Sequence, residues 1–243
     1  MTVAPSSVYP GREQHRVRWV LVAILAFLLG GLAVALLYRF DVFGSSSTST
    51  TEGSGVPAAQ TRHVAPFESV ELAGSNNVVI RVGEQQSVVV RADRNLLDRV
   101  TTDVRSGTLV IGNTPGSFTT SSPMSVSVDV PKLDALTLTG SGNIAVTDIA
   151  APSLEVKLPG SGTVTGSGSV TRLDVTVSGS GAVQFTRVAA NAVGAAVSGS
   201  GSIIVTAAKS LDASVSGSGA ILYTGNPQEL TRNVAGTGTI VGR

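Results

Sequence analysis

The tripeptide Gly-Ser-Gly recurs at a nearly constant spacing through the C-terminal half of this 243-residue chain, and a final Gly-Thr-Gly continues the series. Successive copies begin roughly 20 residues apart, and a fixed period of this length predicts one small structural unit that stacks on copies of itself. The paired glycines are Gly140 and Gly142, Gly160 and Gly162, Gly179 and Gly181, Gly199 and Gly201, Gly217 and Gly219, and Gly236 and Gly238.

Aliphatic residues flank every triplet at alternating positions, which is the period of a strand and not of a helix. Two residues before the first glycine stand Leu138, Leu158, Val177, Val197, Val215 and Val234. Four residues after it stand Ile144, Val164, Val183, Ile203, Ile221 and Ile240. We expect these two sets to form two buried ladders.

A repeat this short leaves no room for a helix between parallel strands. The sequence therefore predicts an all-β fold, a parallel β-solenoid (β-helix) whose coils stack ~4.8 Å apart. The triplets are expected to be bends. Their glycines would supply either a positive φ or room for the close approach of neighbouring coils.

The N-terminal part has a different composition. Trp19–Tyr38 is an uncharged, mostly apolar run, and at about 20 residues it is long enough to cross a bilayer as one helix. Arg12, Arg16 and Arg18 precede it, which predicts a cytoplasmic N-terminus. A cleaved signal peptide is the alternative, but the apolar run is long for that role. We expect a single-pass signal-anchor in the plasma (inner) membrane, with a short cytoplasmic tail (1–18), a transmembrane helix (19–38), a flexible Ser/Thr/Gly-rich spacer (39–61) and an extracytoplasmic β-solenoid (62–243).

Between the spacer and the regular repeats, the pattern is irregular. Gly74-Ser75-Asn76 has aliphatic residues at the same offsets and is interpreted as a degenerate first copy. Strands are expected at 87–91, 108–111 and 125–130, with a short helix at 95–100. The turn-rich segment Gly112–Pro123 is expected to be a loop, and its single aromatic residue, Phe118, is a candidate contact residue.

Several motifs together carry a family resemblance. They are FESVEL, NLLDRVTTDVRSGTLVI, VDVPKLDALTLTGSGNI, the repeated SGSG, and ILYTGNPQELTRNVAGTGTI. The chain from about residue 67 to residue 243 resembles the auto-transporter adhesin head GIN domain family, a bacterial domain of unknown function. The resemblance implies a right-handed parallel β-helix and an adhesin-like role, and it supplies no catalytic residues.

Acidic residues are the main candidates for chemistry. Glu155, Asp174 and Asp212 share one outward position, five residues before the triplet. Carboxylates on adjacent coils would lie ~5 Å apart, as in a β-helix glycosidase or a Ca²⁺ site. Because Gly194 interrupts this column and basic residues lie nearby, we interpret it as a solvated face.

The remaining composition narrows the classes of function. The chain has no Cys and a net charge of +1, so neither disulfides nor a nucleic-acid partner are expected. Phe185 and Tyr223 occupy inward positions and are expected to fill the core. His15 and His63 fall in the tail and at the start of the solenoid region, where a ligand role is not expected. No cofactor or metal site is predicted.

These observations predict a membrane-anchored, extracytoplasmic, non-catalytic module that binds or supports other molecules at the bacterial cell surface. Its partners would be the bilayer, through residues 19–38, and an unidentified protein or cell-envelope polymer. One alternative is an envelope-stress or signalling accessory protein that senses a partner outside the membrane. The other is a β-helix enzyme acting on polysaccharide. The sequence does not predict the oligomeric state.

Overall fold

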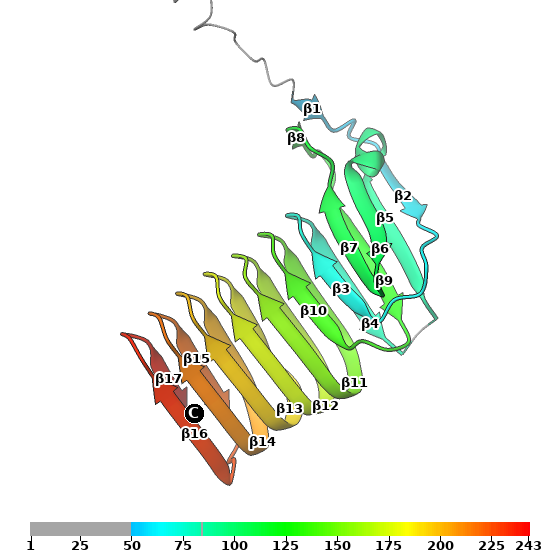
Figure 1. Ribbon diagram of the computed structural model, residues 1–243. Helices are drawn as coiled ribbons and strands as arrows, with labels where there is room; N and C mark the ends of the chain where they lie inside the picture. The colour runs from blue at the N-terminus through cyan, green and yellow to red at the C-terminus, as the bar shows by residue number, and fades with distance from the viewer. Residues whose placement is uncertain (1–49, 84) are drawn as a thin grey trace, which may run out of the picture. The chain divides into compact units, whose positions relative to one another are not determined.

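The computed structural model describes residues 50–83 and 85–243 and shows an all-β chain with a β-solenoid of about five turns (Figure 1). The predicted fold class is therefore confirmed for the repeat region. The apolar segment 19–38 lies outside the described residues. Among the residues that are described, no helix is both long enough and apolar enough to span a bilayer.

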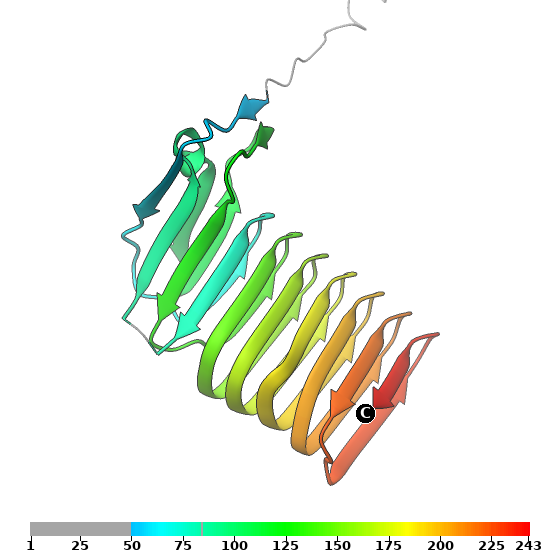
Figure 2. The same cartoon turned by 180° about the vertical axis from the view of Figure 1, so that it is seen from behind.

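The regular coils are formed by parallel strands that follow one another in sequence order, as Figure 2 shows from behind. Ile144 pairs with Val164, which pairs with Val183, and the same register continues through Ile203 and Ile221. One ladder thus occupies one column of the solenoid, as the repeat predicts. The strands are β10 (Ala135–Leu138), β11 (Asn143–Leu158), β12 (Thr163–Val177), β13 (Ala182–Val197), β14 (Ser202–Val215), β15 (Ala220–Thr224), β16 (Glu229–Val234) and β17 (Thr239–Gly242).

Each regular coil bends twice, and only one of the bends interrupts a strand. The glycine triplet ends one strand and starts the next. At the other bend β11 to β14 continue for 14 to 16 residues and turn through irregular pairing. Between Val146 and Ile149 the register shifts, and Asp148 there has φ 60°. A β-bulge lets a strand turn a corner without leaving the sheet.

Antiparallel strands close the N-terminal end of the solenoid, where the sequence predicts only irregular coils. The elements of this end are β3 (Ser69–Leu72), β4 (Asn77–Val82), β5 (Ser87–Asp93), the 3₁₀ helix η1 (Arg94–Arg99), β6 (Val100–Arg105), β7 (Thr108–Asn113) and β9 (Ser125–Val130). β5 runs antiparallel to β9, and β6 antiparallel to β7. Such strands cover the edge that a bare first coil would leave open for aggregation.

The expected spacer is partly structured. Within its range lie β1 (Thr51–Glu52) and β2 (Pro57–Thr61), so the assignment of residues 51–61 to a flexible tether is wrong. β2 pairs with the outer edge of β5, and β1 pairs with β8 (Phe118–Thr119). Local composition favours a tether because Ser, Thr and Gly dominate there. These residues nevertheless form strands, because they pair with strands that lie far away in the sequence.

The ladder residues form the core of the solenoid. All twelve are buried except the two in the last coil, Val234 and Ile240. Val234 is 46% exposed, which corrects our expectation that it is buried. The physical reason is that β16 and β17 each pair with only one strand, so no further coil covers their inner side chains.

The triplet glycines are needed for space more than for backbone conformation. Among the twelve, only Gly236 has a positive φ. A Cβ added at Gly199 would overlap the carbonyl oxygen of Gly179 in the coil below. The backbone N–H of Gly201 donates to that same oxygen at 3.1 Å. Close contact between coils, one of the two roles expected of the glycines, therefore accounts for these residues.

Two aromatic rings fill the core, each beside a glycine in the same column. Phe185 is fully buried, and a Cβ on Gly166 would lie 2.8 Å from its ring. Tyr223 is 8% exposed and lies in the same way against Gly242. In each case the missing side chain of one coil makes room for the ring of a neighbouring coil, so neither aromatic residue is available for stacking with a ligand.

Candidate functional site

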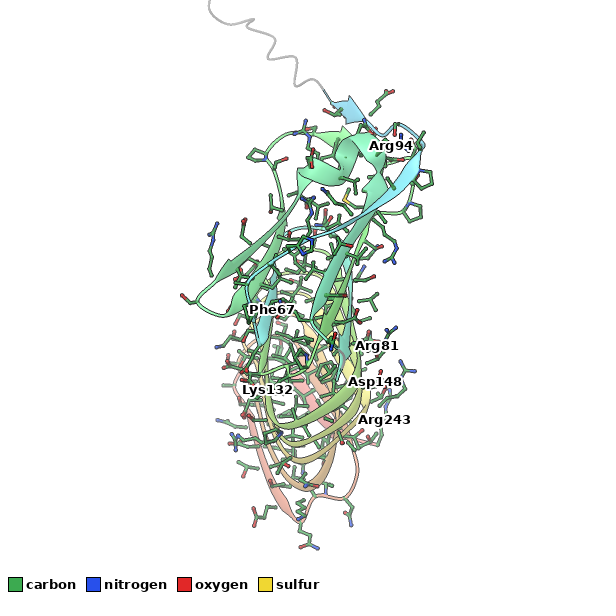
Figure 3. All side chains as sticks on the ribbon, turned by 90° about the vertical axis from the view of Figure 1, so that its right-hand side faces the viewer. Phe67, Arg81, Arg94, Lys132, Asp148 and Arg243 are labelled. Atoms are coloured by element: carbon green, nitrogen blue, oxygen red, sulfur yellow. The ribbon has the colours of Figure 1, made fainter. Side chains whose placement is uncertain are left out.

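The solenoid presents two broad outer faces with different chemistry. We call face A the outward side chains of β10, β16 and the C-terminal halves of β11 to β14. Face B comprises the outward side chains of β4, β15, β17 and the N-terminal halves of β11 to β14. Figure 3 shows the two sides, with Lys132 near face A and Arg81 and Arg243 at face B. Most charged residues of the regular coils lie on face A.

The predicted acidic column lies on face A in the expected register. Glu155 pairs with Asp174, Asp174 with Gly194, and Gly194 with Asp212. The glycine therefore places Asp174 and Asp212 two coils apart, ~9.6 Å at the spacing of sheet strands. The column does not bring three acidic groups together. In the described part of the chain, no cluster of three or more His, Asp or Glu side chains could hold a metal ion.

Two of these carboxylates are held by basic residues of their own coil. Arg172 donates to both oxygens of Asp174, with Nε–Oδ2 and Nη2–Oδ1 distances of 2.7 Å. This hydrogen bonding, together with the negative charge of Asp174, raises the pKa of the Arg172 guanidinium. Lys157 Nζ lies 2.8 Å from Glu155 Oε1. These short-range pairs fix the direction of the charged side chains on an exposed surface.

A similar network lies at the base of face A. Lys132 Nζ is 2.8 Å from both Asp134 Oδ2 and Glu68 Oε2. The hydrogen bonds to Asp134 and Glu68 raise the pKa of Lys132. The bond from Lys132 is also the main reason that the pKa of Asp134 is lowered. The network joins the segment that precedes β10 to the segment that precedes β3, and it engages all three charged groups.

A groove crosses face A where one coil has almost no outward side chains. Its floor is Ala192, Gly194 and Ala196 on β13, and its volume is about 450 Å³. A second depression of about 500 Å³ shares Ala192, Ser210 and Glu229 with the first, so the two are continuous. The walls carry charges and hydroxyls, contributed by Arg172, Asp174, Thr176, Lys209, Ser210, Asp212, Ser214, Glu229 and Thr231.

The groove is open, polar and slightly acidic. Three acidic groups (Asp174, Asp212, Glu229) and two basic ones (Arg172, Lys209) give it a net charge of −1. Small-molecule enzyme sites are mostly enclosed and lined by apolar groups, whereas this one is open and lined by polar groups. Sequence reasoning found the acids but missed the groove. The sequence feature that could have predicted the groove is the segment 192–196, where every outward residue is Ala or Gly.

Phe118 lies at the far N-terminal end, away from this groove. It is half-buried and belongs to β8, where Phe118 pairs with Thr51 of β1. The backbone N–H of Thr51 donates to the carbonyl of Ser117 at 2.9 Å, and that of Gly53 to Thr119 at 2.8 Å. The segment Gly112–Pro123 is thus tied to the strand that leads into the domain and is not a free loop.

Asp93 is the anchor of this junction. It is fully buried, and Oδ2 accepts hydrogen bonds from the backbone N–H groups of Ser121 at 2.8 Å and Ser122 at 3.2 Å. Its Oδ1 accepts from the hydroxyl of Ser122 at 2.8 Å. Burial by itself raises the pKa of Asp93, but the hydrogen bonds from Ser121, Ser122 and Gly55 outweigh burial and hold the pKa below its usual value.

This arrangement predicts a pH-dependent contribution to stability. Because the folded pKa is lower than the unfolded one, the contribution of Asp93 is present above pH ~4 and is lost as the pH falls through the folded value. The difference in urea midpoint between wild type and Asp93→Asn should be constant near neutral pH and shrink below pH ~4. Asp103→Asn, on the exposed side of β6, is the matched control. A midpoint difference independent of pH would contradict the role given to Asp93.

The fold places the protein in the class of parallel β-solenoids, here with an open polar groove on one face. Comparison with family models gives the specific family. The model described as "Putative auto-transporter adhesin, head GIN domain" matches residues 66–227. The chain belongs to this family, as the motifs predicted.

Solved structures show the same fold. A putative adhesin of Bacteroides fragilis has a TM-score of 0.66 at 21% identity, covering 79% of this chain and 99% of its own. A putative lipid-binding protein of Parabacteroides distasonis has a TM-score of 0.53 at 21% identity, covering 80% and 99%. A putative adhesin of the same species gives 0.53 at 20% identity, covering 80% and 100%. A search of curated proteins gave no match.

Proposed function

We propose that this protein is a membrane-anchored, extracytoplasmic binding module of adhesin type that holds a cell-envelope polymer in the groove of face A without turnover. The observation that carries the proposal is the coil of Ala192, Gly194 and Ala196, flanked by coils whose outward side chains are larger and polar. It leaves a trough across a rigid sheet. Relatives of the same fold are named as adhesins or as lipid-binding, and none of these three as an enzyme.

The charges of the groove indicate the chemistry of the polymer. With a net charge of −1 and a lining of hydroxyls, it favours a chain that carries both hydroxyl and ammonium groups. Asp212 and Glu229 are the acidic groups best placed to meet an ammonium. Asp174 already has both oxygens engaged by Arg172. The same engagement holds the Asp174 carboxylate against Arg172 of its own coil, which disfavours Asp174 as the group that would transfer a proton to a glycosidic bond in the enzyme alternative.

Binding through the groove can be tested with purified peptidoglycan sacculi, which offer amino and hydroxyl groups on an insoluble polymer. The compact unit Ser49–Arg243 should sediment with the sacculi. Ala196→Trp fills the groove and should weaken binding by about tenfold or more, equivalent to ~1.4 kcal/mol. Thr137→Trp occupies the same column three coils away, outside the groove, and should leave binding unchanged. Equal binding by the two variants would contradict the groove as the site.

Anchoring and orientation have their own test. The full sequence contains no cysteine, so a single introduced thiol is a clean probe. A membrane-impermeant maleimide should label Ser49→Cys on intact cells and should miss Ser6→Cys until the membrane is permeabilised, because Arg12, Arg16 and Arg18 hold the N-terminus inside. Labelling of Ser6→Cys alone would reverse the orientation, and labelling of both on intact cells would contradict a membrane-spanning anchor.

A further inference from the structure

On the regular coils, from β11 to β17, face B is a sheet surface almost free of charge. Its central row runs in register through Ala145, Thr165, Gln184, Ile204, Leu222 and Val241. The row parallel to it, two residues earlier on each strand, is equally uncharged from β11 to β17. From position 133 onward, charged residues fall on or beside face A, at the bends, on the uncovered inner side of β16 or at the last residue. Packing of the core does not require this segregation of charged residues, because the core contains only the inward side chains.

The central row does not stop at the solenoid. Val79 of β4 pairs with Ala145 on one side and with Ser127 of β9 on the other. Ser127 pairs with Val89 of β5, and Val89 with Thr61 of β2. The row therefore crosses ten strands, from β2 to β17, without a charged residue of its own. Charged side chains flank it on β4, β5 and β9, where Arg81 Nη1 lies 3.5 Å from Asp129 Oδ1 and Arg91 donates to Ser127 Oγ at 2.7 Å. Aliphatic side chains along it remain accessible to solvent, with Val79 45% and Val241 48% exposed.

The size of this face is that of a protein–protein interface. Ten strands ~4.8 Å apart, with five residues of each at ~3.3 Å per residue, span ~700 Å². Two such faces would bury ~1,400 Å² in total, within the range of stable specific interfaces. The charged side chains of this face are Arg81, Arg91, Asp129 and Arg243, all outside the central row. Monomeric proteins seldom expose a largely uncharged, partly aliphatic surface of this extent.

The chemistry of face B selects a second copy of the same chain over other partners. A charged polymer or an anionic membrane would lose hydration against this face and find no opposite charge in the central row. Sugar rings usually stack on exposed aromatic side chains, and the row has none. A second face B meets neither objection: its central row is equally uncharged, and its small side chains allow two sheets to pack ~10 Å apart.

We propose that two copies of this protein associate through face B, back to back around a twofold axis. In this arrangement both faces A point outward and both grooves stay accessible. The dimer would then be a bivalent binder, because one polymer-bearing surface could engage two grooves at once. The association itself does not depend on the function proposed for the groove.

Cross-linking of the full chain in its membrane tests the pairing. Thr165 lies near the centre of the ten-strand row, so a twofold axis through that centre places it opposite its own copy. With a short bis-maleimide, Thr165→Cys should give a covalent dimer. Ser214→Cys, on face A, should remain monomeric. Comparable dimer yields from the two variants, or none from Thr165→Cys, would overturn the proposal.

A second substitution separates face B from nonspecific collision. Ile204→Lys, added to Thr165→Cys, would bury an ammonium in an uncharged interface and should reduce the dimer yield by at least tenfold. Its side chain points outward and is only half-buried, so the fold should be retained, which the urea midpoint checks. Thr137→Lys, at a half-buried position of face A outside the groove, is the matched control and should leave the dimer yield unchanged. An unchanged yield with Ile204→Lys would overturn the proposal, whatever the sacculus assay shows for the groove.

Discussion

Val197→Asp is expected to destabilise the unit Ser49–Arg243 by ~3 kcal/mol or more. Val197 is 2% exposed and is paired with Val177 below and Val215 above, so an aspartate there would have aliphatic neighbours on both sides. Burying a carboxylate without a partner costs its hydration, and none of these aliphatic neighbours can donate a hydrogen bond in its place. The urea midpoint of the purified unit, compared with wild type, measures the loss.

Ser200→Asp is the matched control for this substitution. Ser200 lies three positions further along the same coil, on the exposed tip of the triplet bend, where a carboxylate stays in water. It should change the free energy of unfolding by no more than ~0.5 kcal/mol. If both aspartates left the midpoint unchanged, the assignment of the inward and outward positions would be wrong.

Gly199→Val tests the reason for the glycine pairs and is expected to cost about 3 kcal/mol. The added Cβ would overlap the carbonyl oxygen of Gly179, a backbone atom of the coil below that cannot rotate away. The coils would have to separate locally, weakening bonds such as the one from the N–H of Gly201 to that oxygen. Urea unfolding of the unit Ser49–Arg243 gives the loss.

Ser198→Val places the same side chain one position earlier in the same bend. Ser198 is exposed, so the substitution adds a β-branched residue without an added clash against the neighbouring coil. A small effect at Ser198 with a large one at Gly199 would support close coil contact. Similar losses at both positions would point instead to the conformational preference of the bend itself.

The candidate site shows how far local sequence patterns reach. The shared offset of Glu155, Asp174 and Asp212 placed them on one outward column, and the strand register agrees. The groove between Asp174 and Asp212 was not predicted, because it arises from what β13 lacks. Its depth depends on the side chains of both neighbouring coils. The same holds for Gly166 and Phe185, where one coil's missing side chain accommodates the ring of the next.

The sequence by itself determined the solenoid, its period and the two buried ladders. In a repeat fold each coil contacts mainly its neighbours, so the pattern within a single repeat already fixes the register of the stack. The tertiary structure alone decided the N-terminal end. There β5 and β6 turn antiparallel, residues 51–61 add two strands, and Asp93 accepts hydrogen bonds from the distant Ser121 and Ser122. These pairings have no period, because they satisfy one particular edge of the sheet, and only the assembled chain brings their partners together.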